Sequence, residues 1–254
     1  MVCFRVTGVH LRPVKVAVML AAELAANILL MMGCYLYVLA VIFVSGKLDK
    51  FQGISSKMSR KFLHIMIGNL PFIIPFFTLA TFPTLVAAPF ILVTFLATPY
   101  SPFKSVNRKL QGLAEITGEG HRWGLVFYAI SYTCLAFLFA QKSYVIAAGI
   151  LPMAYGDAAA SIVGEKFGRH KYALVARKSL EGSAAMFLVT LASLTAGLIF
   201  FSVIYGFSFL SKIPALLSVA VVATLVEGFS PMGFDNLTVP AFSVLTFLLY
   251  SGGA

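Results

Sequence analysis

The sequence predicts an all-α integral membrane protein: a polytopic transmembrane helical bundle of about seven or eight spans, folded as a single domain. Of its 254 residues, 60% are hydrophobic and only 11% are charged, whereas about a quarter of the residues in a soluble domain are charged. The apolar residues also form runs that approach the roughly 20 residues a helix needs to cross a bilayer. Too little polar surface remains to cover a globule in water, which excludes an ordinary soluble domain.

The first predicted span runs from Val16 to Val44 and follows several basic residues, as in a signal peptide. It far exceeds the apolar core of about 7–15 residues in such a peptide, so we expect it to remain as a membrane anchor. Prolines interrupt several later stretches, and membrane helices tolerate this where neighbours satisfy the freed backbone groups. The predicted spans are 16–44, 62–80, 82–98, 124–141, 143–163, 184–210 and 213–228, with 237–250 as a short or tilted eighth.

The net charge of +10 comes from basic residues beside apolar spans, so we expect a bilayer surface or a polyanionic substrate as partner and no nucleic acid. Most of the Lys and Arg residues fall in the loops 45–61, 99–123 and 164–181. Two predicted spans separate each of these loops from the next, which places all three on one face. The positive-inside rule makes that face cytoplasmic, although the basic N-terminus, one span away from the first loop, disagrees.

The acidic residues gather on the same face, apart from Glu23 within the first span. Acids contribute little to topology, so their position indicates a site that uses carboxylates. Glu23 lies one helical turn from Asn27, where the two side chains can bond each other, a neighbouring helix or a lipid headgroup. The cysteines, Cys3, Cys34 and Cys134, lack metal-like spacing, and we expect free thiols, with the last two buried in apolar runs.

The segment AYGDAAASIVGEKFGRHK, residues 154–171, places Asp157 about two turns before the polar end of an apolar helix. A carboxylate there costs on the order of 2.5–3.5 kcal/mol, so it usually has a partner or a function. The small residues around it allow close helix packing, and Gly164 and Gly168 open a basic turn. A carboxylate, glycines and cations can together bind a magnesium nucleotide, or they can form a packing motif with a basic end.

Three further segments carry polar groups beside spans. In RKSLEGS, residues 177–183, a serine can cap the sixth span, whose N-terminus favours an anion; an ordinary capped helix is the alternative. Arg60 and His64 in RKFLH share a helix face. His64 can accept a proton while Arg60 supplies a positive charge, or the two residues can form an interfacial anchor. Asp235-Asn236 offers oxygen ligands of the kind Mg²⁺ prefers, or forms a solvated turn. A fifth segment, EITGEGHRWG at 115–124, mixes acids, glycines and basic residues. The sequence contains no GxxxxGK[ST] loop, so a nucleotide would be bound by other residues than a Walker loop.

Taken in order, these segments resemble the polyprenol kinase family, which includes phytol, dolichol and CTP-dependent diacylglycerol kinases and is related to phosphatidate cytidylyltransferases. The similar stretches are RKFLH (60–64), EGHRWG (119–124), the 154–171 segment, RKSLEGSAAMF (177–187) and FDNLTVP (234–240). The last of these looks most like phytol and related isoprenol kinases. The resemblance covers a core of about 60–245, whereas 1–59, the N-terminal anchor span and basic loop, matches nothing we can use.

The resemblance implies transfer of a phosphoryl group from a nucleoside triphosphate, typically CTP, to the hydroxyl of an isoprenoid alcohol such as phytol, geranylgeraniol or a polyprenol. The alcohol stays in the bilayer and the nucleotide in the cytosol, so the active site is expected at the cytoplasmic face. Phosphoryl transfer needs mainly positioning and charge neutralisation, with a divalent cation such as Mg²⁺. The absence of a long leader favours a prokaryotic cell membrane.

The resemblance and the residue chemistry together assign roles to individual residues. Asp157, His64, Lys178 and Glu181 are the expected catalytic residues, with His64 or Asp157 accepting the hydroxyl proton. The expected metal ligands are Asp157, Glu181, Asp235 and Asn236. The expected nucleotide- and phosphate-binding residues, besides Lys178, are Arg60, Lys61, Gly164, Lys166, Gly168, Lys171, Arg177 and Ser179.

Three alternatives stay open. A diacylglycerol kinase differs only in its acceptor, and a cytidylyltransferase moves CMP onto a lipid phosphate instead. A transporter would use Asp157 and Glu23 as intramembrane polar groups, but the acids gather on one face and do not line a path through the bilayer midplane.

Overall fold

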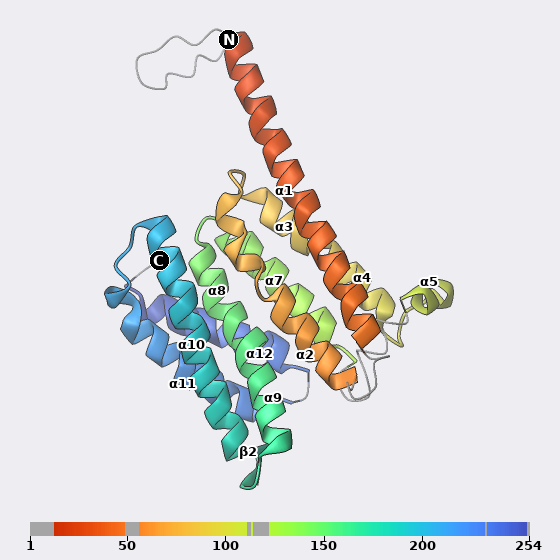
Figure 1. Cartoon of the computed structure of the whole chain (residues 1–254), viewed down its shortest axis with the longest axis vertical. Coiled ribbons are helices and arrows are strands. Elements are labelled where there is room, and N and C mark those ends of the chain that lie inside the picture. The colour runs from red at the N-terminus through yellow and green to blue at the C-terminus, as the bar shows by residue number, and fades with distance from the viewer. Residues whose placement is uncertain (1–12, 49–55, 111–112, 114–121, 232, 253–254) are drawn as a thin grey trace.

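The structure is a computed structural model that describes residues 13–48, 56–110, 113, 122–231 and 233–252 (Figure 1). These residues are almost entirely helical, which confirms the all-α prediction. One short antiparallel hairpin interrupts the helices, where β1 (Lys171–Ala173) pairs with β2 (Arg177–Ser179). The helices are α1 (Pro13–Leu48), α2 (Ser56–Ile67), α3 (Thr81–Ala87), α4 (Pro89–Ala97), α5 (Lys104–Lys109), α7 (Gly124–Phe139), α8 (Ser143–Leu151), α9 (Asp157–Lys166), α10 (Leu180–Tyr205), α11 (Ile213–Phe229) and α12 (Asp235–Tyr250).

Among the described residues, four helices are long and apolar enough to cross a membrane. They are Ala17–Leu48, Ser143–Lys166, Leu180–Tyr205 and Leu210–Phe229, and each overlaps one of the predicted spans. The count of seven or eight is therefore not confirmed. The remaining predicted spans correspond to shorter helices, of which Thr81–Ala97 and Gly124–Phe139 are apolar.

Prolines explain why the predicted span 62–80 is not one helix. The helix α2 ends at Ile67, and two 3₁₀ turns, η1 (Leu70–Phe72) and η2 (Ile74–Phe76), follow it. Each turn carries a proline near its start, where the missing N–H and the ring prevent continuation of an α-helix. Pro89 likewise opens α4 directly after α3. The apolar character was predicted correctly, but the helix lengths were not.

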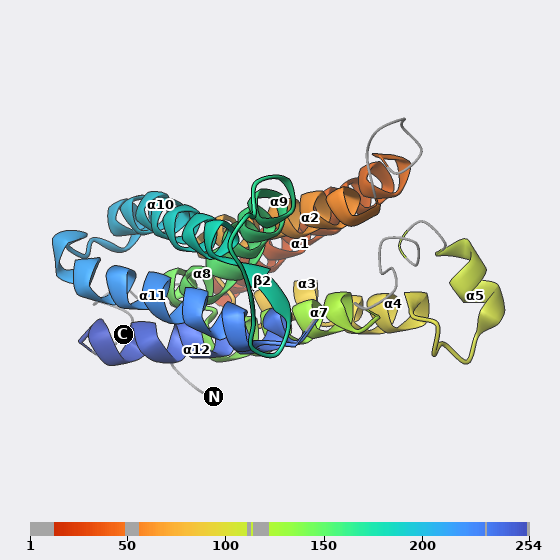
Figure 2. The same ribbon diagram turned by 90° about the horizontal axis from the view of Figure 1, so that it is seen from below.

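The core is built around α8, whose residues are nearly all buried. It packs on α7, α10 and α12, and α11 packs between α10 and α12 (Figures 1 and 2). By contrast, α1 contacts mainly α2 and α3 and leaves large apolar side chains exposed, among them Leu29 and Leu36. Similar exposed apolar residues occur on α7 and α10, including Phe137 and Val203. Apolar surface of this extent marks a membrane or protein contact.

Two smaller predictions are refined by the packing. Asn27 joins α1 to the turn after η2, because its amide donates to the Thr78 hydroxyl at 2.7 Å and accepts from the Thr78 and Leu79 N–H groups at 3.1 and 3.2 Å. The bond to a neighbouring element is therefore the correct alternative for Asn27. Cys34 is buried and unbonded as expected, but Cys134 is exposed on the outer face of α7, so its predicted burial was wrong. Cys3 lies outside the described residues.

Candidate functional site

A polar cavity of about 830 Å³ lies where α2, α9, β2, α11 and the start of α12 meet. The predicted polar segments 60–64, 154–171, 177–187 and 234–240 all contribute to it, although they are far apart in the sequence. Six basic and four acidic residues line the cavity, which leaves a net positive charge suited to an anionic ligand. They are Lys57, Arg60, Lys61, Lys171, Arg177, Lys178, Asp157, Glu165, Glu227 and Asp235.

Asp157 is placed by an irregular turn in the long helix that begins as α8. A π-helical segment, η3 (Pro152–Gly156), separates α8 from α9, and Asp157 is the first residue of α9. Such π segments often occur at functional sites. The carboxylate is buried and forms an ion pair with Lys61 of α2, whose ammonium also lies 3.4 Å from the Asp157 carbonyl oxygen. The Asp157 charge therefore has a partner, as the cost of its burial requires.

Lys178 of β2 forms the second ion pair of the cavity with Glu227 near the end of α11. Glu227 is 2% exposed, so the sheet edge and the helix end are joined by buried charges. Burial lowers the pKa of Lys178, but the attraction and hydrogen bond of Glu227 outweigh it, and the net shift of this pKa is upward. Lys178 therefore carries its positive charge at neutral pH and is available to bind phosphate.

Asp235 begins α12 and lines the same cavity. Burial, and after it the charge of Asp157, raises the pKa of the Asp235 carboxyl to about 6, against the opposing effect of Lys61 and Lys178. Arg60 faces both carboxylates: burial lowers its pKa, and Asp157 and Asp235 oppose that shift. Asp157 and Asp235 are therefore close enough to repel each other, and a cation between them relieves that repulsion.

The pair Asp157 and Asp235 fits a divalent cation that a nucleotide helps to hold. No cluster of three or more His, Cys, Asp or Glu side chains arranged for a metal occurs among the described residues, so a cage built wholly from the protein is not present in this part of the chain. Mg²⁺ commonly binds through one or two carboxylates plus substrate phosphates and water. Beside Asp235, the buried side-chain oxygen of Asn236 has no hydrogen-bond partner within the described structure, and it is a further oxygen donor of the required type.

Glu181 does not join this cluster. It lies in the first turn of α10, where its carboxylate accepts from Nδ1 of His170 at 2.7 Å and from the His170 backbone N–H at 3.2 Å. The acids that line the cavity with Asp157 and Asp235 are Glu165 and the buried Glu227 instead. No role was predicted for Glu227 from the sequence. Its position at the polar end of an otherwise apolar span was the available signal.

The other predicted phosphate ligands divide into two groups. Lys171 and Arg177 line the cavity, and the Lys171 ammonium also donates to the Gly164 carbonyl at 2.9 Å. Lys166 is exposed and is absent from the lining. His64 is also absent from the lining, because its ring is buried 4.7 Å from that of Tyr128, measured between centroids. A direct role of His64 in proton transfer stays a prediction.

The glycines of the site allow α9 and α10 to approach closely. A Cβ on Gly182 of α10 would lie 2.9 Å from the Ala160 carbonyl oxygen of α9, and one on Gly164 of α9 would lie 3.6 Å from the Gly182 Cα. Ser179 caps α10 by accepting from the Gly182 N–H at 3.2 Å, as the sequence predicted for a serine in this segment. The packing and the nucleotide interpretations of these glycines are therefore compatible, since Gly164, Ser179 and Gly182 also line the cavity.

Part of the predicted site cannot be placed. Of the segment 115–124, residues 115–121 lie outside the described residues. Trp123, at the end of this segment, stacks on Tyr100 with ring centroids 5.5 Å apart and on Phe127 at 6.2 Å. Trp123 is the N-cap residue of α7.

Curated relatives match most of the chain. A phytol kinase of Synechocystis sp. is 33% identical over 216 residues, which cover 82% of this chain and 86% of that protein. Phytol kinase 1, a chloroplastic protein of Arabidopsis thaliana, is 29% identical over 91% of this chain and 77% of its own length. A probable chloroplastic phytol kinase of Triticum aestivum is 30% identical over 94% and 81%. No family model matches the chain, and no solved structure matches it.

Proposed function

Because the chain belongs to the polyprenol kinase family, and its curated relatives are phytol kinases, we propose that it is a membrane-embedded kinase of isoprenoid alcohols that uses CTP. The observation that supports this best is the convergence of Asp157, Asp235, Lys61 and Lys178 on one polar cavity. The long apolar helices support the placement in a membrane. The acceptor is an alcohol such as phytol, geranylgeraniol or a polyprenol, and we place the active site on the cytoplasmic face.

In the structure, two pairs of charged side chains in the cavity neutralise each other, Lys61 with Asp157 and Lys178 with Glu227. Binding of a triphosphate exchanges these partners: the two lysines turn to phosphate oxygens, and Asp157 becomes free for a divalent cation. Mg²⁺, when bound, supplies neutralisation of the charge that develops on the transferred phosphoryl group. The exchange limits the cost of burying Lys61, Lys178 and Asp157, because each of these three groups has a partner in both states.

Arg60, Lys171 and Arg177 add positive charge around the phosphates, so that the protein supplies mainly positioning and charge neutralisation. The hydroxyl proton leaves when the oxygen attacks the γ-phosphorus, and the bond from that phosphorus to the bridging oxygen breaks to release CDP. We assign the acceptance of this proton to the Asp157 carboxylate, with His64 as the alternative.

The test uses purified protein in detergent with CTP labelled at either the α- or the γ-phosphate. We expect γ-label in the lipid product, whereas α-label would identify a cytidylyltransferase. An acceptor panel of phytol, geranylgeraniol, a polyprenol and diacylglycerol distinguishes an isoprenoid alcohol kinase from a diacylglycerol kinase, and ATP and UTP in place of CTP define the donor. Flux of a solute without nucleotide use would favour a transporter.

Asp157→Asn removes the carboxylate but nearly keeps its shape, so we expect turnover to fall to background while the protein still inserts and purifies normally. Normal activity in this variant would refute the assigned role of Asp157. Ser161→Ala alters a neighbouring lining residue on α9 to which no role is assigned, and it serves as the matched control.

A further inference from the structure

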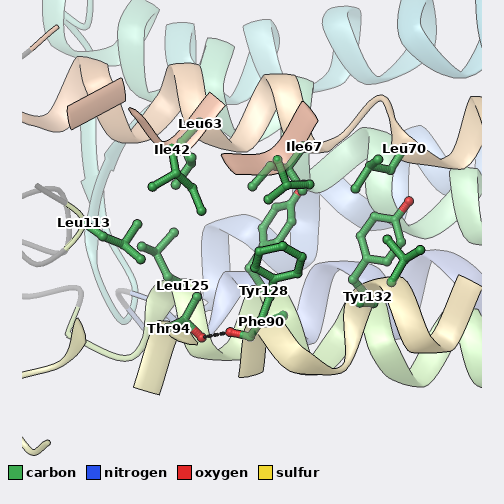
Figure 3. A pocket seen from close by; sticks show the side chains of 14 residues that line it. Ile42, Leu63, Ile67, Leu70, Phe90, Thr94, Leu113, Leu125, Tyr128 and Tyr132 are labelled. Carbon is green, nitrogen blue, oxygen red and sulfur yellow. Dashed lines mark hydrogen bonds between the residues drawn. The ribbon is translucent and has the colours of Figure 1, made fainter. Parts of the chain in front are cut away.

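A second cavity, of about 50 Å³, lies on the other side of α2 and is lined almost wholly by apolar side chains. It sits between two layers of helices, with α1 and α2 on one side and α3, α4 and α7 on the other (Figures 2 and 3). Leu63 and Ile67 of α2 face Leu125, Tyr128 and Tyr132 of α7 across it (Figure 3). An apolar cavity of this kind accepts hydrocarbon and stays free of water.

The helix α2 separates the two cavities and contributes to both. Arg60 and Lys61 line the polar cavity, whereas Leu63 and Ile67 line the apolar one. Residues three apart in a helix are surface neighbours, about 5–6 Å apart at their Cβ atoms. Arg60 and Leu63 are therefore adjacent, and the two cavities approach each other at this edge of α2. The hydroxyl of an alcohol can reach the polar cavity here while the carbons next to it stay in the apolar one.

The apolar cavity offers little to a polar ligand. Thr94 donates its hydroxyl to the Phe90 carbonyl at 2.7 Å, and Tyr128 donates to the His64 carbonyl at 3.1 Å, so both groups are already engaged. The buried hydroxyl of Tyr132 has no partner among the described residues. Tyr132 lies one turn beyond Tyr128 on α7, and in Figure 3 it is beside Leu70 and not beside Leu63. An ester carbonyl next to the hydroxyl, as in diacylglycerol, would lose its hydrogen bonds to water on entering the Arg60 end, which disfavours it.

The size of the cavity limits what enters it. A water-sized group needs about 10–15 Å³ of such space, so about 50 Å³ takes only a few carbon atoms, on the order of one isoprene unit. The rest of a long tail must therefore leave the cavity. We place the exit along the seam between α1 and α4, because α1 packs mainly on α2 and α3 while α4 packs on α7. The ring contact of Tyr35 with Phe90, 6.1 Å between centroids, crosses this seam, so the tail passes beside it.

We propose that this apolar cavity binds the isoprene unit next to the hydroxyl of the acceptor alcohol, with the remaining tail leaving between α1 and α4. The inference rests on the proposed kinase function and names the feature of the acceptor that is recognised. The cavity selects a methyl-branched, ester-free first unit and is insensitive to total chain length. Geraniol, farnesol and geranylgeraniol therefore share one binding mode, in contrast to diacylglycerol.

The test fills the cavity from α7. Ala129 lines it, and Ala129→Leu adds carbon atoms where the first isoprene unit would lie. We expect KM for geranylgeraniol to rise at least tenfold, with KM for CTP unchanged. Cys134→Leu adds a similar side chain on the exposed face of the same helix and is expected to keep wild-type values. An unchanged KM for the alcohol in Ala129→Leu, with CTP-dependent transfer intact, would overturn the inference while leaving the kinase function standing.

A second measurement does not depend on turnover or on that variant. A farnesol analogue with a photoreactive diazirine on its first isoprene unit is bound to the wild-type protein without nucleotide, and the labelled peptides are sequenced. We expect label on Leu63–Ile67 of α2 or Leu125–Tyr132 of α7, with competition by geranylgeraniol and none by a phospholipid. Label confined to α10 and α11, or competition by phospholipid alone, would refute the pocket. Correct labelling in a protein that phosphorylates no alcohol would support the pocket and refute the kinase.

Discussion

The pair Lys178–Glu227 allows a phosphate-binding role to be separated from a structural one. Lys178→Met removes the ammonium and leaves the Glu227 carboxylate buried without its partner. Glu227→Gln removes the opposite charge and leaves Lys178 able to donate. The double variant Lys178→Met/Glu227→Gln removes both charges and keeps the approximate volumes. The three proteins and the wild type form a double-mutant cycle.

The magnitudes follow from burial. The side chains of Lys178 and Glu227 are 22% and 3% exposed, so the pair is largely removed from water. Breaking a buried pair by deleting one partner costs about 3–5 kcal/mol, whereas replacing both partners is often close to neutral. We therefore expect Lys178→Met to be destabilised by about 3 kcal/mol, since the pair is not fully buried, and the double variant to recover most of that loss. Catalysis should behave differently, because removal of one preorganised charge at a reacting centre costs about 10²–10³ in kcat.

Two measurements on the same four proteins provide the test. Thermal unfolding in detergent reports stability, and the initial rate of γ-label transfer from CTP to geranylgeraniol reports catalysis. We expect the double variant to unfold near the wild-type temperature and to remain at least 100-fold slower than Glu227→Gln, which still contains Lys178. If the double variant regained the rate of Glu227→Gln together with its stability, Lys178 would have no role beyond its ion pair, and the assignment would fail.

Two further predictions concern stability alone. The pKa of Asp235 is raised to about 6 from an ordinary value near 3.9. Protonation of Asp235 therefore stabilises the folded, metal-free protein. This stabilisation is fully present below pH 4 and is lost as the pH rises through 6. The shift is worth on the order of 3 kcal/mol, so the metal-free protein should melt at a higher temperature at pH 5 than at pH 7.5. In Asp235→Asn, the difference between these two melting temperatures should become smaller. If the variant kept the full difference, the effect would belong to another group. Gly182→Ala places a Cβ 2.9 Å from the Ala160 carbonyl oxygen and should destabilise the protein by about 1–3 kcal/mol in the same melting assay. Gly33→Ala meets no atom within 4 Å and should be neutral or slightly stabilising; equal melting temperatures for the two variants would contradict the close packing of α9 on α10.

Much of the helical architecture follows from the order of apolar and polar residues along the chain. Long apolar runs predict helices, and α1, the α8–α9 segment, which continues through Pro152, α10 and α11 follow the predicted spans closely. In the remaining apolar stretches, whether a proline ends a helix depends on whether neighbouring elements form hydrogen bonds with the backbone groups that it leaves free. For this reason the sequence did not show that 62–80 ends as two 3₁₀ turns.

Most residues of the candidate site could be predicted from the sequence, but their pairing could not. Polar residues at the ends of apolar runs had to gather at one end of the bundle, which is why Asp157, Asp235, Lys61 and Lys178 were identified from the sequence. Which charge pairs with which depends on how helices approach one another, a property of tertiary packing. Only the structure therefore brought Glu227 to Lys178 and turned Glu181 toward His170. The apolar cavity beside α2 also had no counterpart in the sequence, because its lining residues look like any other buried side chains until several helices enclose a space.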